Sequence, residues 1–394
     1  MKKDVVVVSG VRTAIGKFGG SLKDYPAPDL MALVIKEALN RVNVPPEVVG
    51  DVIVGQCMQR TDELVTARLA GLKAGLPITV PGVTIQRNCA SGMQAVVYGA
   101  QQIMLGDEDI IVAGGVEVMS RVPYVLNDAR WGKRLQHGVM ADGVIDGLTD
   151  TWSGLIMGLT AENLAAKYNI SREEQDEIAL RSHNCAESAT KAGKFKDEIV
   201  PVEIPQPKGA PIVFDTDEHF RPGLRMEDLA KLKPAFKKDG TVTAGNASGI
   251  NDAAAAVVLM SKEKAEEMGI KPIARLRSYA VAGVEPELMG YGPVPATKKA
   301  LERGGFKLED MELIELNEAF AAQYLACEKL LGLRRDITNV NGSGVALGHP
   351  VGCTGARIII TLLNEMRRRG NSLGMASLCV GGGMGMTTIW EMVG

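Results

Sequence analysis

The sequence predicts an α/β fold built from two similar halves, and three observations lead to this prediction. Short apolar segments alternate with helical patterns through the first 120 residues, which is typical of α/β layers. A pattern from this part returns near the C-terminus. Between the two copies lies a segment rich in charge, glycine and proline, which indicates an inserted, loop-rich unit.

The elements of the first half follow from the spacing of apolar residues. Continuous apolar runs predict strands, and apolar residues three to four positions apart predict helices. We expect strands at 5–8, 49–54, 83–85 and 110–113, and helices at 29–40, 63–74 and 93–105. The run "AAAAVVLM" at 253–260 predicts a further, buried strand.

The internal repeat is visible in short sequence matches. "KEALNR" begins at Lys36, 53 residues before Cys89, and "KKALER" begins at Lys298, 54 residues before Gly352. "CASGMQA" and "GCTGAR" then each open a helix that leads to a strand ending in glycines. Self-similarity at a long period indicates the fold. The expected units are an N-terminal half, 1–120 plus 246–270, an inserted loop domain, 121–245, and a C-terminal half, 271–394.

The inserted segment has two notable features. Ser171 and Glu174 have the spacing of a capping box, which predicts the start of a helix. Six basic side chains against three acidic ones lie within 221–240, at Arg221, Arg225, Lys231, Lys233, Lys237 and Lys238. This local basic patch fits either a phosphorylated ligand or an ordinary solvated surface.

Composition excludes several classes of protein. The net charge of −3 and the 4% aromatic content give no basis for binding nucleic acid or an anionic membrane. No apolar run approaches the length of a membrane span, and the four valines at 5–8 are too few for the apolar region of a signal peptide. The six cysteines show neither a Cys-x-x-Cys pair nor the spacing of metal ligands. We therefore expect a cytoplasmic protein with reduced thiols and no metal.

Cys89 lies where a predicted strand turns into a predicted helix, within "QRNCASGMQA" at 86–95. The first N–H groups of a helix are unpaired and carry a partial positive charge, which lowers the pKa of a nearby thiol. The same groups can receive an oxyanion during acyl transfer. The position alone also fits a buried structural cysteine, and the Asn88 side chain is a possible helix cap.

His349 occupies the matching turn of the second half, within "ALGHPVGCTGAR" at 346–357. Pro350 biases it towards extended backbone, and Gly348 and Gly352 bracket it. A stiff turn suits an imidazole that acts as a base. We favour His349 over His137, His183 and His219, which lie in the loop-rich part or in a charged helix.

Two further stretches carry polar groups at strand ends. In "SLCVGGGMG" at 377–385, Cys379 ends a predicted strand, and the glycines that follow allow backbone N–H groups to approach a ligand. In "NEAF" at 317–320, Asn317 can hold a water or an oxygen, whereas Glu318 either caps a helix or orients a neighbour.

A nucleotide-dependent reductase is the alternative weighed for "NGSGVALGH" at 341–349, which has the glycine spacing of a dinucleotide loop. Such a loop requires a helix that begins inside the glycine run, and His349 and Pro350 stand there instead. The strand-like "MTTIW" after the other glycine run also disfavours a nucleotide site.

The four motifs together, "NCASG", "NEAF", "GHPVGCTGAR" and "CVGGGMG", resemble in content and order those of the thiolase family. The similarity extends essentially over the whole chain and includes "AGNASGINDAAAA" and "MGYGPVPA". The resemblance implies the thiolase fold, two similar α/β halves in an αβαβα arrangement with an inserted loop domain that binds coenzyme A. It also implies ping-pong acyl transfer between acyl-CoA molecules, without a metal or redox cofactor.

The resemblance implies a role for each motif. Cys89 would carry the acyl group, His349 would take its proton, and Cys379 would remove or return the α-proton of the acetyl unit. Asn317, through a water, and His349 would form one oxyanion site. The backbone N–H groups of Cys89 and Gly381 would form the other. The matched coenzyme A positions are Leu148, Met157, Arg221, Phe236, Ala244, Ser248, Met289, Ala319 and Phe320.

The expected activity is acetyl-CoA C-acetyltransferase, and the alternative is a 3-ketoacyl-CoA thiolase for longer chains. Biosynthetic members of the family usually carry a histidine where Ile156 stands, and Asp228 replaces a serine often found near the adenine. A thiolase-like protein that binds acyl-CoA without turnover is a third possibility, disfavoured by the two thiols and the histidine. The family also implies a homodimer or homotetramer.

Overall fold

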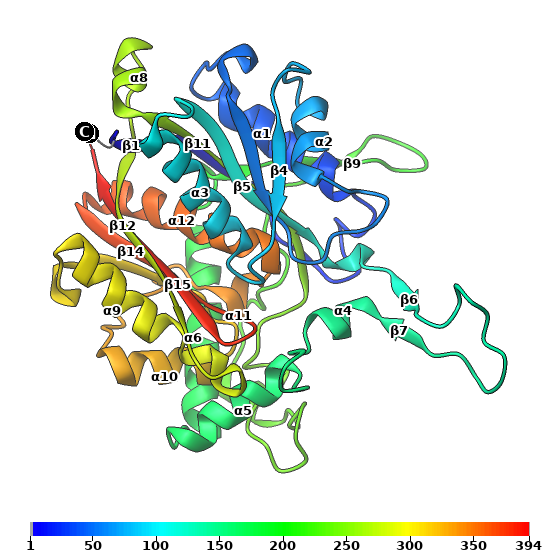
Figure 1. The fold of residues 1–394 in the computed structure, drawn as a ribbon. Helices are drawn as coiled ribbons and strands as arrows, with labels where there is room; N and C mark the ends of the chain where they lie inside the picture. Colours follow the sequence, from blue (N-terminus) through cyan, green and yellow to red (C-terminus); the bar gives the residue numbers. More distant parts are fainter. Residues whose placement is uncertain (1–2, 394) are drawn as a thin grey trace.

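The computed structural model describes residues 3–393 as an α/β protein with a large twisted sheet (Figure 1). The strands of its N-terminal part alternate with helices, as the sequence predicts. These elements are β1 (Val5–Thr13), β2 (Gly16–Lys17), α1 (Ala27–Asn40), β3 (Asp51–Gly55), α2 (Thr66–Lys73), β4 (Gly82–Ile85), α3 (Ser91–Leu105), β5 (Ile110–Val118), β11 (Asn251–Ser261) and α8 (Lys262–Glu267).

The C-terminal part repeats the same alternation. It is built from β12 (Ala274–Gly283), α9 (Pro293–Gly304), β13 (Leu313–Leu316), α10 (Ala321–Leu331), α11 (Gly344–Leu347), α12 (Val351–Arg369), β14 (Leu373–Val380) and β15 (Met384–Met392). Short 3-10 helices are η1 (Pro46–Val48), η2 (Met119–Arg121), η3 (Pro286–Tyr291) and η4 (Leu308–Asp310).

Strand order shows that the two parts are related. The sheet runs β13-β14-β15-β12-β1-β11-β5-β3-β4, and antiparallel pairing of β1 with β12 joins the parts. Outward from this junction, and leaving aside the two-residue strand β2 that pairs at the side of β11, each part places its first strand, then its last, its last but one and its second. In the N-terminal part β4 follows as the third strand. In the C-terminal part a single bridge between Thr338 and Ile314 takes its place. The predicted internal repeat is therefore a repeat of topology.

The layers follow from which helices contact which strands. Helix α12 packs against β5 and β11 of one part and against β13 and β14 of the other, and against α3. Helix α1 covers the N-terminal strands, and α9 covers β12 and β15 (Figure 1). Helices α3 and α12 therefore form a central layer, and the strand β11 beside them is buried along its whole length, as its alanine and valine run predicts.

The segment between β5 and β11 contains more helix than its composition predicts. Ser171 accepts a hydrogen bond from the Glu174 N–H, and the Glu174 side chain accepts one in return, so the predicted capping box is confirmed. The other helices of the segment were not predicted. Its elements are β6 (Tyr124–Leu126), β7 (Met140–Asp142), α4 (Gly143–Gly147), α5 (Met157–Lys167), α6 (Arg172–Lys191), β8 (Ile199–Val200), β9 (Val202–Ile204), β10 (Ile212–Phe214) and α7 (Met226–Ala230).

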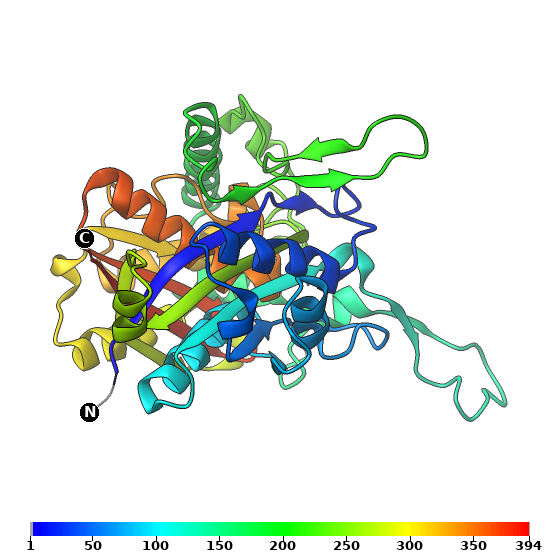
Figure 2. The same cartoon turned by 90° about the horizontal axis from the view of Figure 1, so that it is seen from above.

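Two hairpins of this segment extend away from the main body. The β6–β7 hairpin and the loop it carries project furthest, and the β9–β10 hairpin extends toward the same side of both views, apart from the first (Figures 1 and 2). Helices α5 and α6 instead pack against α10, and α6 also packs against α11. The segment thus contributes one wall next to the C-terminal part.

Glycines let the central helices approach each other. A Cβ atom on Gly92 in α3 would lie 2.8 Å from the Gly352 carbonyl oxygen in α12, and one on Gly355 would lie 2.4 Å from the Met93 nitrogen. A Cβ atom on Gly115 in β5 would lie 2.2 Å from the same Gly352 oxygen. Any larger residue at these positions would push the two helix starts apart.

Gly115→Ala is expected to lower the free energy of unfolding by about 1–3 kcal/mol, because the added methyl overlaps backbone that cannot move aside. Urea denaturation at fixed protein concentration measures the change. Gly138→Ala is the matched control, since no heavy atom lies within 4 Å of the added methyl. Equal stability of both variants would show that the helices can separate without cost.

Candidate active site

The turn that carries Cys89 is held by side chains within "RNCAS". The Ser91 hydroxyl accepts a hydrogen bond from the Arg87 N–H at 2.8 Å and donates to the Asn88 carbonyl at 2.7 Å. Asn88 has a left-handed backbone with φ of 40°, a conformation that asparagine tolerates better than most residues. Cys89 therefore lies just before the first turn of α3, as predicted.

Asn88 does not cap the helix, contrary to the possibility raised from the sequence. The N-cap position of α3 is Ala90, which makes no side-chain capping bond. The Asn88 amide instead donates to the Gly381 carbonyl oxygen at 2.8 Å. Its side chain therefore joins the Cys89 turn to the glycine turn between β14 and β15.

His349 lies on the predicted stiff turn before α12. Gly348 has φ of 104°, and Asn251 accepts a hydrogen bond from the His349 backbone N–H at 3.0 Å. A side chain at Gly348 would lie within 2.6 Å of the Asn251 amide. The β11 strand thus supports the histidine turn directly.

The tautomer of His349 follows from its partner. The Thr354 hydroxyl lies 2.7 Å from His349 Nδ1 and donates to the Pro350 carbonyl at 2.9 Å. A hydroxyl has one proton to donate, so it accepts from the ring, and the ring proton lies on Nδ1. The lone pair of Nε2 is then free to accept a proton.

His349 is neutral near pH 7. Burial, together with the positive charge of Arg357, lowers the pKa of the imidazole to about 3. A neutral imidazole can act as a base, whereas an imidazolium cannot. The environment therefore leaves the ring unprotonated and able to accept a proton, while the same lowered pKa makes it a weaker base than a free imidazole.

Both thiols have a raised pKa, contrary to the lowered value that the helix start led us to expect for Cys89. Burial raises the pKa of Cys89, although the N–H groups of Gly381 and of Cys89 itself oppose the rise. The pKa of Cys379, at the end of β14, is raised well above its usual value by burial and by the nearby Cys89. The predicted lowering of the Cys89 pKa is wrong, so a thiolate forms only when a neighbouring group takes the proton.

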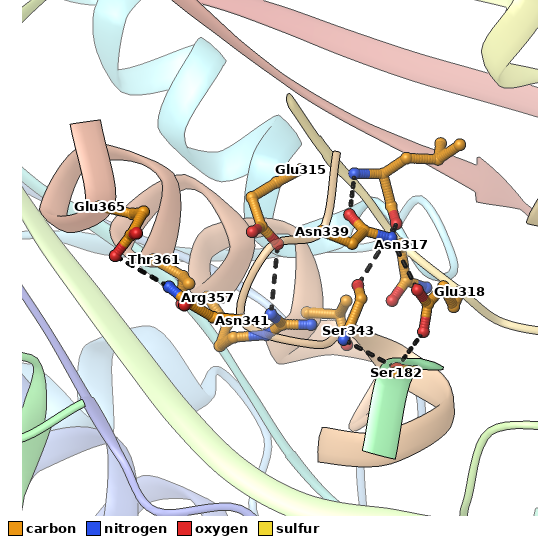
Figure 3. A network of polar contacts seen from close by, with 12 residues as sticks. Ser182, Glu315, Asn317, Glu318, Asn339, Asn341, Ser343, Arg357, Thr361 and Glu365 are labelled. Atoms are coloured by element: carbon orange, nitrogen blue, oxygen red, sulfur yellow. Dashed lines mark hydrogen bonds and ion pairs between the residues drawn. The ribbon is translucent and has the colours of Figure 1, made fainter. Parts of the chain in front are cut away.

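Asn317 approaches the same histidine from the strand β13. Its amide nitrogen lies 3.4 Å from Nδ1 and 3.5 Å from Nε2 of His349. The turn is fixed by buried groups behind it, because Glu318 accepts from Ser182 at 2.5 Å and from Asn339 at 2.8 Å (Figure 3). Glu318 orients its neighbours and does not cap α10, whose N-cap is Phe320.

A cavity of about 350 Å³ opens at Cys89 and His349. Its walls are mostly apolar and come from α4, α5, the 235–250 loop and the "NEAF" turn. Cavities of this size and character hold small ligands. Predicted coenzyme A positions that line it are Leu148, Met157, Phe236, Ala244, Ser248, Met289, Ala319 and Phe320.

Arg221 is the predicted coenzyme A residue that this cavity does not include. It lines a separate surface depression with Lys17 and His219, and Ile250 borders both spaces. Among the remaining basic residues of 221–240, Arg225 and Lys231 form ion pairs with Asp228 at the surface. The Asp228 carboxylate is therefore already paired with two neighbouring basic side chains.

A second cavity, also about 350 Å³, meets the first at Cys89. The two share Leu148, Met157 and Val351. The second is more polar, with lining residues that include Gln86, Asn88, Asp146, Thr149 and Asp150. Cys89 therefore stands between an apolar and a polar space.

Several functional residues were missed by the sequence analysis. Thr354 and Asn251 hold His349, whereas Ile156, which lines the apolar cavity, was already noted as a departure from the family pattern. Glu117 is fully buried, and its carboxylate accepts hydrogen bonds from the N–H groups of Cys57, Met58 and Gly352. Burial raises the pKa of Glu117 to about 7. A lone glutamate within the apolar run "VAGGVEV" was the pattern that could have revealed it.

The one-turn helix α11 does begin within the glycine run at 341–349, although we expected none there. It ends at Leu347, with Gly348 as its C-cap before His349, so the run forms the histidine turn. Among the described residues, no cluster of metal-ligating side chains and no helix long and apolar enough to cross a membrane is found.

Family models match nearly the whole chain. The thiolase N-terminal domain matches residues 5–263, and the thiolase C-terminal domain matches residues 270–392. The chain belongs to the thiolase family. The resemblance drawn from the four motifs is thus confirmed.

Individual thiolases are similar over their full lengths. An acetyl-CoA acetyltransferase of Chromobacterium violaceum is 54% identical, with 98% of this chain and 99% of the relative covered. The crystal structure of the Bacillus anthracis acetyl-CoA acetyltransferase superposes with a TM-score of 0.98 at 55% identity, covering 100% and 99%. The crystal structure of human mitochondrial 3-ketoacyl-CoA thiolase in complex with CoA superposes with a TM-score of 0.96 at 44% identity, covering 100% of this chain and 98% of the human chain. The predicted thiolase fold is therefore confirmed.

Thr354→Val is expected to shift the ring proton of His349 from Nδ1 to Nε2 in most molecules, because the valine removes the acceptor at Nδ1. Nuclear magnetic resonance of ring ¹⁵N at pH 7 distinguishes the two tautomers. Thr354→Ser keeps the hydroxyl and should keep the Nδ1 proton. A proton on Nε2 in the unaltered protein would contradict the assignment.

Proposed function

We propose that the protein is an acetyl-CoA C-acetyltransferase that converts two acetyl-CoA into acetoacetyl-CoA and CoA, reversibly and through an acetyl-cysteine. One observation carries the proposal: Cys89 and a neutral His349 lie on the wall of one apolar cavity, with the Gly381 N–H directed at the sulfur. The acetyl-CoA acetyltransferase names of similar proteins support it.

Acylation begins with the sulfur of Cys89. His349 Nε2 takes the Cys89 proton, and the sulfur attacks the acetyl carbonyl carbon. The N–H groups of Cys89 and Gly381 stabilise the oxyanion. The bond from that carbon to the CoA sulfur breaks, and the departing CoA takes a proton from Cys379. A thioester on the enzyme then keeps the energy of the thioester that was consumed.

Condensation uses the second acetyl-CoA. The Cys379 thiolate removes a methyl proton, and Asn317, through a water, and His349 stabilise the enolate oxygen. The enolate carbon attacks the acetyl carbon on Cys89, a carbon–carbon bond forms, and the carbon–sulfur bond to Cys89 breaks. The proton held by His349 returns to Cys89. Neither a metal nor a redox cofactor takes part in these steps.

Coenzyme A fits the apolar cavity by its chemistry. The pantetheine arm is thin and has few charges, and side chains such as Leu148, Met157 and Phe236 offer it apolar contact. The human relative was crystallised with CoA. Arg221 is the candidate contact at the adenine end, where its depression borders the cavity at Ile250. The proposal includes a cytoplasmic location and a homodimer or homotetramer. Size measurements in solution test the oligomeric state.

A 3-ketoacyl-CoA thiolase for longer chains is the second candidate. The second cavity at Cys89 has room for an acyl tail, and this favours the longer-chain thiolase. The polar side chains of that cavity, among them Gln86 and Asp146, disfavour an apolar tail. The balance favours the two-carbon acyl group.

Cys89→Ala is expected to lower kcat about 10³-fold or more, because no other group can carry the acetyl unit. Cys379→Ala should still be acetylated by acetyl-CoA, but it should not condense. Mass spectrometry of the protein after mixing with labelled acetyl-CoA detects the acyl-enzyme. Normal deuterium exchange at the acetyl methyl in Cys379→Ala would refute its role as the base.

Chain length is tested in the direction of cleavage by CoA. We expect kcat/KM for acetoacetyl-CoA to exceed that for 3-ketohexanoyl-CoA and 3-ketooctanoyl-CoA by about tenfold or more, since each methylene would enter a polar space. Thiol consumption and loss of the 3-ketoacyl absorbance give the rates. Equal or higher rates with the longer substrates would establish the second candidate.

A further inference from the structure

Asn88 joins two turns that are distant in sequence and adjacent in space. It immediately precedes Cys89, and its amide donates to the Gly381 carbonyl at 2.8 Å across the boundary between the two halves. This bond links Asn88, the neighbour of the candidate nucleophile, to Gly381. Gly381 supplies the N–H that acts on the Cys89 sulfur together with the N–H of Cys89 itself. A change at Asn88 therefore acts on both N–H groups of the oxyanion site.

The glycine turn needs such a restraint. Gly382 and Gly383 have φ of 87° and 79°, and together with Gly381 they form the turn between β14 and β15. Glycine lacks a Cβ atom, so its backbone rotates more freely than that of other residues. A bond to the Gly381 carbonyl limits this rotation and fixes the direction in which the Gly381 N–H points.

The other end of the Asn88 amide is also held. The Cys57 thiol lies 3.6 Å from Asn88 Oδ1 and donates to it, and the Cys57 backbone N–H donates to Glu117 at 2.9 Å. Glu117 in turn accepts from the Gly352 N–H at the start of α12. A continuous set of bonds therefore runs from the helix after His349, through Asn88, to the glycine turn.

We propose that Asn88 is a positioning residue that sets the direction of the Gly381 N–H relative to the sulfur and backbone N–H of Cys89. The oxyanion site works only when both N–H groups point at the same oxygen. Because Asn88 touches neither the ligand nor the reacting atoms in this role, it acts through Gly381. The catalytic part of this inference rests on the acetyltransferase function proposed above.

Two variants separate the amide from the backbone. Asn88→Gly accepts the left-handed φ and removes the amide. Asn88→Asp keeps the shape and replaces the N–H donor by a carboxylate, which cannot donate to the Gly381 carbonyl. Asn169→Gly is the control, because Asn169 is also left-handed, with φ of 48°, is exposed, and lines neither cavity.

The first measurement is steady-state kinetics with acetyl-CoA and acetoacetyl-CoA. Both Asn88 variants should lower kcat about tenfold to a hundredfold, less than loss of a whole oxyanion donor, with KM changed less than about threefold. Asn169→Gly should match the unaltered protein. Values of kcat within twofold for both Asn88 variants would overturn the proposal, as would a combined loss of thermal stability and CoA affinity, which indicates a purely structural role.

The second measurement does not depend on turnover. The rate of Cys89 alkylation by iodoacetamide, followed by mass spectrometry from pH 7 to 11, reports the thiolate. In Asn88→Gly its midpoint should move to higher pH, because the misdirected Gly381 N–H stabilises the thiolate less. An unchanged midpoint would overturn the positioning role. If the midpoint shifts in Asn88→Gly but the unaltered protein does not turn over acetyl-CoA, the positioning role is upheld and the acetyltransferase function is rejected.

Discussion

Helices α3 and α12 touch backbone to backbone where Gly92, Gly352 and Gly355 meet, and the distance between Cys89 and His349 follows from that contact. The two residues are 260 positions apart in sequence. Each stands just before the first turn of its helix. When the helix starts are pressed together, the thiol and the imidazole reach one cavity. The related topology of the two halves supplies the matching turns, and the glycines remove the side chains that would keep them apart.

Buried charged side chains surround helix α12. Arg12 pairs with Glu198 and Asp217 at 2.7 Å, and Thr361 of α12 donates to Glu198 at 3.0 Å. Arg357 of α12 lies 3.9 Å from Glu315 of β13, with both side chains fully buried (Figure 3). Such pairs are costly to desolvate and add little net stability. Here the Arg357 charge has a chemical effect, because it helps to keep His349 unprotonated.

Much of this arrangement could be predicted from the sequence because local patterns carry it. The strand at 253–260, the capping box at Ser171 and the turns at Cys89 and His349 each depend on residues within a few positions. The roles of Asn88 and Thr354, the buried Glu117 and the raised pKa of Cys89 could not be predicted. Each depends on burial or on partners that only the folded chain brings near. Arg221 was predicted from its matched position in the thiolase family. A matched position does not determine which depression of the folded chain a side chain lines.

The pairing of β1 has a consequence for how the protein is made. Val5 pairs with Ser261, and Val6 pairs with Arg275. The first strand therefore leaves the ribosome long before either of its neighbours has been synthesised. Pairing across such separations is slow, and an unpaired apolar strand is prone to aggregate meanwhile. Cys89 emerges early but remains without its imidazole until His349 has been synthesised, so a chain that stops before that residue carries the thiol and no base.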